Sequence, residues 1–97
     1  MTRTDLVRTV ADRNGLPARA AGQVVDAVID GIAEALCSGR RVQVRGFGAW
    51  RARHYPGYVG RNPRTGERVF VPAKVLPVFR PARALLARVR RTPSEEA

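Results

Sequence analysis

Residues 46–66 read GFGAWRARHYPGYVGRNPRTG, and this stretch decides the fold. Its first part predicts a tight Gly46-Phe47-Gly48 turn around a buried Phe47, followed by a strand in which aromatic and basic residues alternate. Its second part has few large apolar side chains, and residues 62–66 have the composition of a turn. Strand character returns in the valine-rich stretch that follows. We therefore expect a β-hairpin arm, at about residues 55–73, that projects from the body of the domain.

Upstream of this stretch, apolar residues recur with the period of a helix. A first helix is expected from Thr2 to Asn14, because Thr2 and Asp5 make a capping-box-like start and Gly15 a stop. A second, longer helix is expected to open at Leu16-Pro17 and to end near Gly39, with one apolar face over about four turns. A short strand should follow, in which Val42 and Val44 alternate with polar residues.

Downstream of the arm, the last strand is expected to end at Phe79 and a third helix to start at Pro81. In that helix Ala84, Leu85 and Val89 should face inward. The predicted fold class is therefore α+β, with two N-terminal helices, a three-stranded antiparallel sheet that carries the β-ribbon arm, and a C-terminal helix. Residues 1–91 make one domain, and residues 92–97 a short polar tail.

The size of the core predicts a dimer. An extended arm adds almost nothing to a core, which leaves roughly 75 residues to form one, and a single core of that size is marginal. The apolar face of the second helix is also wider than the small sheet needs. We expect an intertwined dimer, either of two identical chains or of this chain with a related one.

The charge predicts a polyanionic partner. The 97 residues hold 18 Lys and Arg against 8 Asp and Glu, a formal net charge of +10, and all but Lys74 of these cations are Arg. An apolar content of 44% is that of a globular chain, so the charge does not come from a disordered basic tail. Codon bias could explain the preference for Arg over Lys, but it does not explain the excess of positive charge.

Other classes of protein are disfavoured. The sequence lacks an apolar run of roughly 18 residues, which excludes a membrane-spanning helix, and its N-terminus lacks a secretory signal, so we expect a cytoplasmic protein. Neither a metal nor a cofactor is expected, since no His/Cys cluster offers a zinc site. Cys37 should be a small, partly buried residue. We do not expect an enzyme, because no pair of acidic residues is placed for acid–base work.

The order of these elements resembles the bacterial histone-like family of HU and integration host factor. The resemblance spans Thr2 to Arg91. It rests on Gly46-Phe47-Gly48, on residues 60–66, on Pro72 and on Phe79-Arg80-Pro81, all in the family's order and spacing. It implies a nucleoid-associated dimer whose two arms reach into the minor groove of double-stranded DNA. It also implies that Pro63 wedges between base pairs, a role suited to a rigid ring without an N–H.

The resemblance also implies which residues contact DNA: those on the arm and Arg53 of the preceding strand line the groove, and basic residues on the body touch phosphates. The candidate DNA-binding residues are Arg3, Arg53, Tyr55, Tyr58, Arg61, Asn62, Pro63, Arg64, Thr65, Arg68, Lys74, Arg80 and Arg83. Tyr55 and Tyr58 depart from the family, which commonly has Arg at these arm positions. Their rings could contact sugars, pack together or stiffen the ribbon.

The predicted function is architectural, largely sequence-independent binding that bends and compacts DNA. Two alternatives remain open. One is a site preference of the integration-host-factor kind, which would arise from the deformability of DNA rather than from base contacts. The other is general binding of RNA as well as DNA, because basic charge alone does not separate the two.

Overall fold

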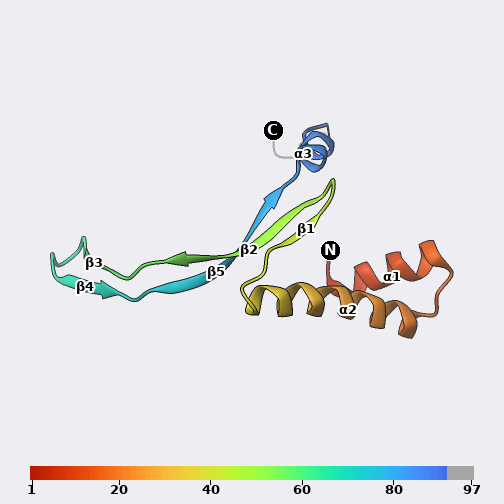
Figure 1. The fold of residues 1–97 in the computed structure, drawn as a ribbon, viewed down its shortest axis with the longest axis horizontal. Helices are drawn as coiled ribbons and strands as arrows, with labels where there is room; N and C mark the ends of the chain where they lie inside the picture. Colours follow the sequence, from red (N-terminus) through yellow and green to blue (C-terminus); the bar gives the residue numbers. More distant parts are fainter. Residues whose placement is uncertain (92–97) are drawn as a thin grey trace. The chain divides into compact units, whose positions relative to one another are not determined.

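The computed structural model describes residues 1–91, which form two compact units, residues 1–35 and the chain from Leu36 onward. Figure 1 shows the elements in chain order, and they confirm the predicted α+β fold class with its ribbon arm. The elements are α1 (Arg3–Asn14), α2 (Ala18–Cys37), β1 (Val42–Val44), β2 (Gly48–Tyr55), β3 (Tyr58–Arg61), β4 (Arg68–Val71), β5 (Lys74–Pro81) and α3 (Arg83–Arg90).

The two N-terminal helices begin and end as their sequences predict. Thr2 caps α1 in a complete capping box with Asp5, and Gly15 ends the helix in the left-handed conformation at φ 61°. Helix α2 begins at Ala18, directly after Pro17. Of its apolar face only Ala21 and Val25 are buried in the single chain, and these are the only buried apolar residues of α1 and α2.

The three-stranded antiparallel sheet has the order β1-β2-β5, with β2 in the centre. Because β5 is an edge strand, it tolerates Pro77, which cannot donate a ladder hydrogen bond. Gly48 allows β2 to pack closely against β5, since a Cβ at this position would lie 2.6 Å from the Arg80 carbonyl oxygen and 2.5 Å from the Phe79 ring. The turn before β2 is closed by the Phe47 N–H, which donates to the Val44 carbonyl at 3.0 Å.

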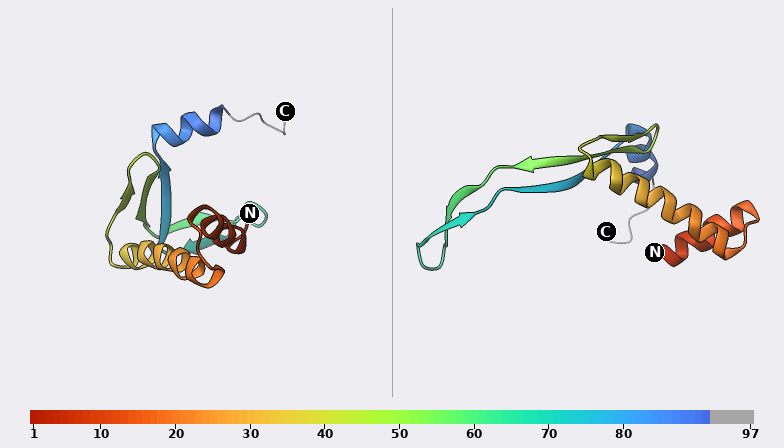
Figure 2. Two further views of the ribbon diagram at one scale, coloured as in Figure 1. Left: turned by 90° about the vertical axis from the view of Figure 1, so that its right-hand side faces the viewer. Right: turned by 60° about the horizontal axis from the view of Figure 1, so that its bottom comes forward.

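The arm continues from β2 and β5 as a second, two-stranded ladder of β3 and β4. The first ladder ends at the pair Tyr55–Lys74, and the second begins at Tyr58–Val71. Between them Pro56-Gly57 faces Pro72-Ala73, so both strands carry a proline at the break, where a missing N–H costs no ladder bond. The right-hand view of Figure 2 shows the hairpin extending as a thin ribbon from the end of β2 and the start of β5.

The structure corrects three local predictions in this part of the chain. Phe47 is 43% exposed in the single chain and not buried, although its ring contacts Trp50 and Phe79 at centroid distances of 5.8 and 5.5 Å. Strand β5 runs past Phe79 to Pro81, which pairs with Gly48. Helix α3 accordingly starts two residues later than predicted, after the N-cap Ala82, whose N–H donates to the Phe47 carbonyl at 2.8 Å.

The inward face predicted for α3 is wrong for the single chain. Leu85 is half-buried, but Ala84 is exposed and Val89 is 61% exposed. Helix α3 has no buried residue in the single chain, so its apolar side chains remain available to another surface.

Candidate nucleic-acid interface

Positive charge is concentrated in the second unit. Residues 36–91 contain 14 Lys and Arg but a single carboxylate, Glu67, whereas residues 1–35 contain four Arg and five Asp and Glu. The excess of positive charge therefore belongs to the sheet, the arm and α3. Such a field favours a polyanion and disfavours the compact state unless one is bound.

The pairing of strands divides the sheet into two chemically different faces. Side chains alternate along each strand, and directly paired residues share a face. Arg51 pairs with Val78 and Arg53 with Leu76, so the face that carries these two arginines also carries Arg80 and Lys74. The opposite face carries the pair Trp50–Phe79, whose ring centroids lie 4.8 Å apart. One face is thus cationic and the other aromatic.

The cationic face is hollowed. A groove with a volume of about 400 Å³ is lined by Arg41, Arg51, Arg53 and Arg80, together with apolar residues of β2 and β5. Sequence reasoning predicted Arg53 and Arg80 here but missed Arg41 and Arg51. Their alternation with Val42 and Trp50 was the available signal, because it places them on the same side of the strands as Arg53.

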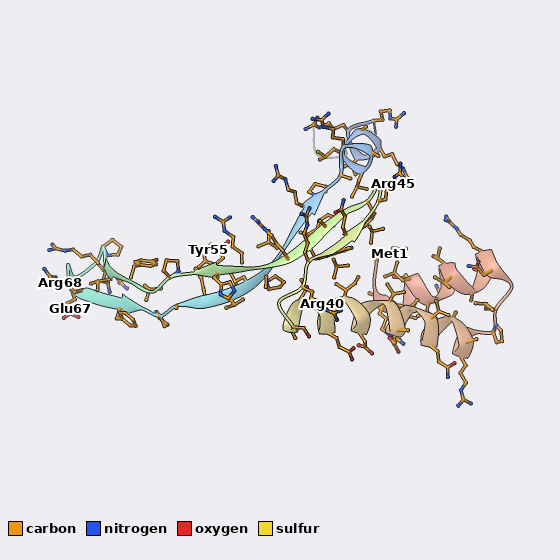
Figure 3. All side chains as sticks on the ribbon, viewed as in Figure 1. Met1, Arg40, Arg45, Tyr55, Glu67 and Arg68 are labelled. Atoms are coloured by element: carbon orange, nitrogen blue, oxygen red, sulfur yellow. The ribbon has the colours of Figure 1, made fainter. Side chains whose placement is uncertain are left out.

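Tyr55 marks the outer end of this face, where the sheet gives way to the arm (Figure 3). The Tyr55 ring is half-buried and pairs across the ladder with Lys74. Arg53 lies over the ring, with its Cζ 5.1 Å from the centroid, and the Lys74 Nζ lies 5.8 Å from it. The structure thus brings two predicted site residues, Arg53 and Lys74, to the ring of a third, Tyr55.

The arm carries both apolar and cationic groups on its surface. Tyr58 is 60% exposed at the start of β3, and Phe70 is also exposed on β4. Nearer the tip, Arg61 pairs directly with Arg68, which Figure 3 labels at the far end of the arm. Like charges directly opposite each other destabilise a ladder, so an anion bound between them would relieve this repulsion.

The tip of the arm is a closed turn that exposes Pro63. The Asn62 Oδ1 accepts a hydrogen bond from the Arg64 N–H at 2.9 Å, and the Thr65 hydroxyl oxygen accepts one from the Glu67 N–H at 3.3 Å. The backbone closes the turn through Asn62 N–H to Glu67 O and Gly66 N–H to Asn62 O, both at 2.8 Å, with Gly66 at φ 74°. Two predicted contact residues, Asn62 and Thr65, therefore have a role within the turn, which holds Pro63 outward between them.

Two predicted site residues lie outside the sheet and arm. Arg3 belongs to the first unit, where its Nε and Nη2 donate to the two carboxylate oxygens of Asp26 at 2.8 Å each. These hydrogen bonds hold the pKa of Asp26 below its ordinary value and raise that of Arg3. Arg83 is exposed as the first residue of α3. Sequence reasoning had given Arg3 only a phosphate-binding role and missed its carboxylate partner.

Three further expectations from the sequence concern Cys37, metal binding and membrane spans. Cys37 is exposed, so its predicted partial burial is wrong. Within residues 1–91, no group of three or more His, Cys, Asp and Glu could hold a metal ion. None of the helices in that range has the length and apolarity needed to cross a bilayer.

The chain is similar to known DNA-binding proteins. A family model described as bacterial DNA-binding protein matches residues 1–90. The DNA-binding protein HU of Geobacillus stearothermophilus is 45% identical over 85 residues, which are 88% of this chain and 94% of that protein. The prophage-derived HU 2 of Bacillus subtilis is 41% identical over 88% of this chain and 92% of its own length.

Solved structures show the same relationship. Anabaena HU, from a cocrystal with DNA, matches with a TM-score of 0.83 at 32% identity, over 95% of this chain and all of that one. HU of Thermotoga maritima matches with a TM-score of 0.64 at 25% identity, over 92% and 98% of the two chains. The match over residues 1–90 and the identity to HU lead to one conclusion: this chain belongs to the bacterial DNA-binding protein family, the family of HU.

Proposed function

We propose that this protein is an architectural protein of the nucleoid, and hence of the cytoplasm, that binds double-stranded DNA largely without regard to sequence and bends and compacts it. The observation that carries the proposal is a cationic sheet face whose strands β2 and β5 lead into an arm with Pro63 exposed at its tip. Arginine forks bind phosphate oxygens bidentately, and a row of them fits a polyanionic backbone. The family is one of DNA-binding proteins and not of enzymes.

The arm enters the minor groove. It is a two-stranded ribbon with apolar residues such as Tyr58 and Phe70 and with cations such as Arg61 and Arg68 toward its tip. Pro63 then acts as an apolar wedge at a base step and kinks the duplex. Unstacking costs a few kcal/mol per step, and the contacts of the bent DNA with the cationic sheet face offset this cost.

Binding of this kind carries little sequence information. The minor groove presents nearly the same donors and acceptors for A·T and T·A pairs. The phosphates are the same at every base pair, so contacts with them carry no sequence information. The cationic groups of the sheet face and the ribbon are almost all arginines carried on β-strands, and strand residues of this kind are not a helix that could read the major groove. Non-specific binding follows.

The working form is a dimer of two identical chains, which supplies two arms. In α2, Val24, Val28 and Ile29 are 48%, 59% and 47% exposed, and the described residues bury only Ala21 and Val25 as a core. A domain of this size cannot be stable with so small a core. A second copy that presents the same apolar faces, including the rings of Phe47 and Phe79, buries them on both sides.

The test is a titration of the protein against four labelled probes at several salt concentrations. The probes are a random-sequence DNA duplex, the same duplex with a nick, the matching RNA duplex, and a DNA duplex of different sequence. The proposal expects a steep fall of log affinity with log salt, preference for DNA over RNA, further preference for the nicked duplex, and similar affinity for the two sequences. Equal affinity for RNA would indicate a general nucleic-acid binder, and a strong preference for one sequence would indicate site recognition.

A further inference from the structure

Tyr55 stands at a distinctive point of the chain. It is the last residue of β2 and pairs with Lys74, the first residue of β5, so the ring lies on the final rung of the sheet before the break that precedes the arm. Figure 3 shows this position at the junction of sheet and hairpin. Arg53 lies two residues earlier on the same face. Arg53 approaches the ring from the same strand, β2, and Lys74 approaches it from the neighbouring strand, β5.

The two cations share the ring without a carboxylate. The Cζ of Arg53 lies 5.1 Å from the ring centroid and the Nζ of Lys74 lies 5.8 Å from it. Between residues 36 and 91 the one acidic residue is Glu67, at the far end of the arm. Two like charges held near each other repel, so this cluster needs an attractive partner. The negative face of an aromatic ring supplies that attraction.

An aromatic partner differs from a carboxylate in one respect that bears on binding. A carboxylate, such as Asp26 beside Arg3, orients a guanidinium but also neutralises it and competes with any phosphate. A tyrosine ring orients a cation while leaving its full charge and its N–H donors for another acceptor. The Tyr55 cluster is therefore ordered but not neutralised.

We infer that Tyr55 is a positioning residue that holds Arg53 and Lys74 as a two-cation clamp for DNA phosphates at the base of the arm. The inference rests on the proposed function and assigns a role to one side chain within it. Long Arg and Lys side chains lose rotamer freedom when they bind a phosphate, and the ring removes part of that loss in advance. The clamp grips the backbone directly before the ladder breaks and the arm begins.

The first part of the test does not involve DNA. Lys74 is the sole lysine, so its ε-methylene protons give one recognisable NMR signal. The ring current of Tyr55 should shift that signal upfield in the free wild-type dimer and in Tyr55→Phe. The shift should be absent from Tyr55→Leu. An identical Lys74 signal in wild type and Tyr55→Leu would overturn the inference whatever the protein binds.

The second part measures affinity for the random-sequence duplex. Tyr55→Phe should bind like wild type, and Tyr55→Leu about fourfold more weakly, a factor of roughly two for each ring–cation contact at an exposed site. The salt slope should stay unchanged in Tyr55→Leu, because both charges remain, and should fall by about one in Arg53→Gln. His54→Leu, on the opposite face of the same strand, is the matched control and should bind like wild type.

A double-mutant comparison separates positioning from direct contact of the ring with DNA. In an Arg53→Gln/Lys74→Gln background, Tyr55→Leu should cause no further loss, because the ring then has no cation to hold. An equal loss in both backgrounds, or no loss in either, would overturn the inference. If wild type binds no duplex at all, the proposed function fails and the clamp fails with it. The NMR shift then still reports whether the ring orders Lys74.

Discussion

Arg3 of α1 and Asp26 of α2 bind each other through a two-pronged salt bridge, and about half of each side chain remains exposed to solvent. The pair links the two helices of the first unit. It also gives the Arg3 guanidinium a carboxylate partner that competes with a DNA phosphate for its charge and for two of its N–H donors, so the bridge bears on both stability and binding.

Asp26→Asn should destabilise the protein in a pH-dependent way. The hydrogen bonds from Arg3 lower the folded-state pKa of Asp26 below its ordinary value of 3.8. A lowered carboxyl pKa stabilises the folded state above the unfolded-state pKa, and this stabilisation is lost as the pH falls through the folded-state pKa. Urea unfolding should therefore show a less stable variant at about pH 6 and a difference from wild type that vanishes in acid. A difference that is constant with pH would contradict the role of the charge.

The same substitution should strengthen DNA binding if Arg3 contacts phosphate. Asp26→Asn frees the guanidinium, so the salt slope of duplex affinity should steepen by about one, the contribution of one phosphate. Asp30→Asn, on the same helix, changes the net charge equally and is the control. Fluorescence titrations of both variants that give the same gain would show that Arg3 does not bind DNA and that net charge alone is responsible.

Pro63→Ala should uncouple bending from affinity. The turn around Pro63 is held by the Asn62 and Thr65 side chains and by the backbone, so alanine should keep its shape while removing the wedge. We expect most of the affinity to remain, because phosphate contacts supply it. Energy transfer between labels at the two ends of a duplex should show less bending. Pro17→Ala, directly before α2, is the control and should bend DNA as wild type does. If Pro63→Ala bends DNA as strongly as wild type, Pro63 is not a wedge.

Arg51→Gln should weaken binding to every duplex about equally. Arg51 lines the groove on the cationic face and points the same way as Arg53. Loss of one phosphate contact should reduce the salt slope by about one. Arg13→Gln, in the last turn of α1, removes the same charge elsewhere and should change affinity less. If Arg51→Gln and Arg13→Gln weaken DNA binding equally, the cationic sheet face is not a preferred DNA-binding surface.

Val28→Asp should dissociate the dimer. Val28 lies on the exposed apolar face of α2, and a charge buried there by a second copy would cost roughly 3 kcal/mol or more without a partner, about a hundredfold in the dimer constant. Sedimentation of the wild type at micromolar concentration should give a dimer, and the variant a monomer or an unfolded chain. Ala27→Asp places the same side chain on another face of the helix and should remain dimeric.

Much of the fold could be predicted because its signals are local. The capping box of Thr2 and Asp5 and the change of period after Gly39 depend only on neighbouring residues, and the structure has the helices and strands they indicate. The start of α3 was misplaced because Pro81 suits either a first helical turn or an edge strand. Pro81 belongs to the strand because it pairs with Gly48, a residue far away in the sequence.

The site was predicted less completely, since it depends on register and on tertiary contacts. Arg41 and Arg51 join Arg53 only once the strands are paired, and the Arg3–Asp26 bridge spans 23 residues. The expected burial of Phe47 and Val89 was wrong for the single chain, because the contacts they make within it leave much of their apolar surface exposed. Local patterns find apolar faces but do not say which molecule covers them.

The double break at residues 56–57 and 72–73 has a mechanical consequence. Since the ladders of sheet and arm are separate, the arm forms its own cooperative unit, and an isolated two-stranded hairpin is only marginally stable. Its amides should exchange with solvent much faster than those of the three-stranded sheet, and a protease should nick it first. The arm can then melt and re-form while the body stays folded, so each encounter with a groove of different width begins from an ensemble of arms rather than from one rigid shape.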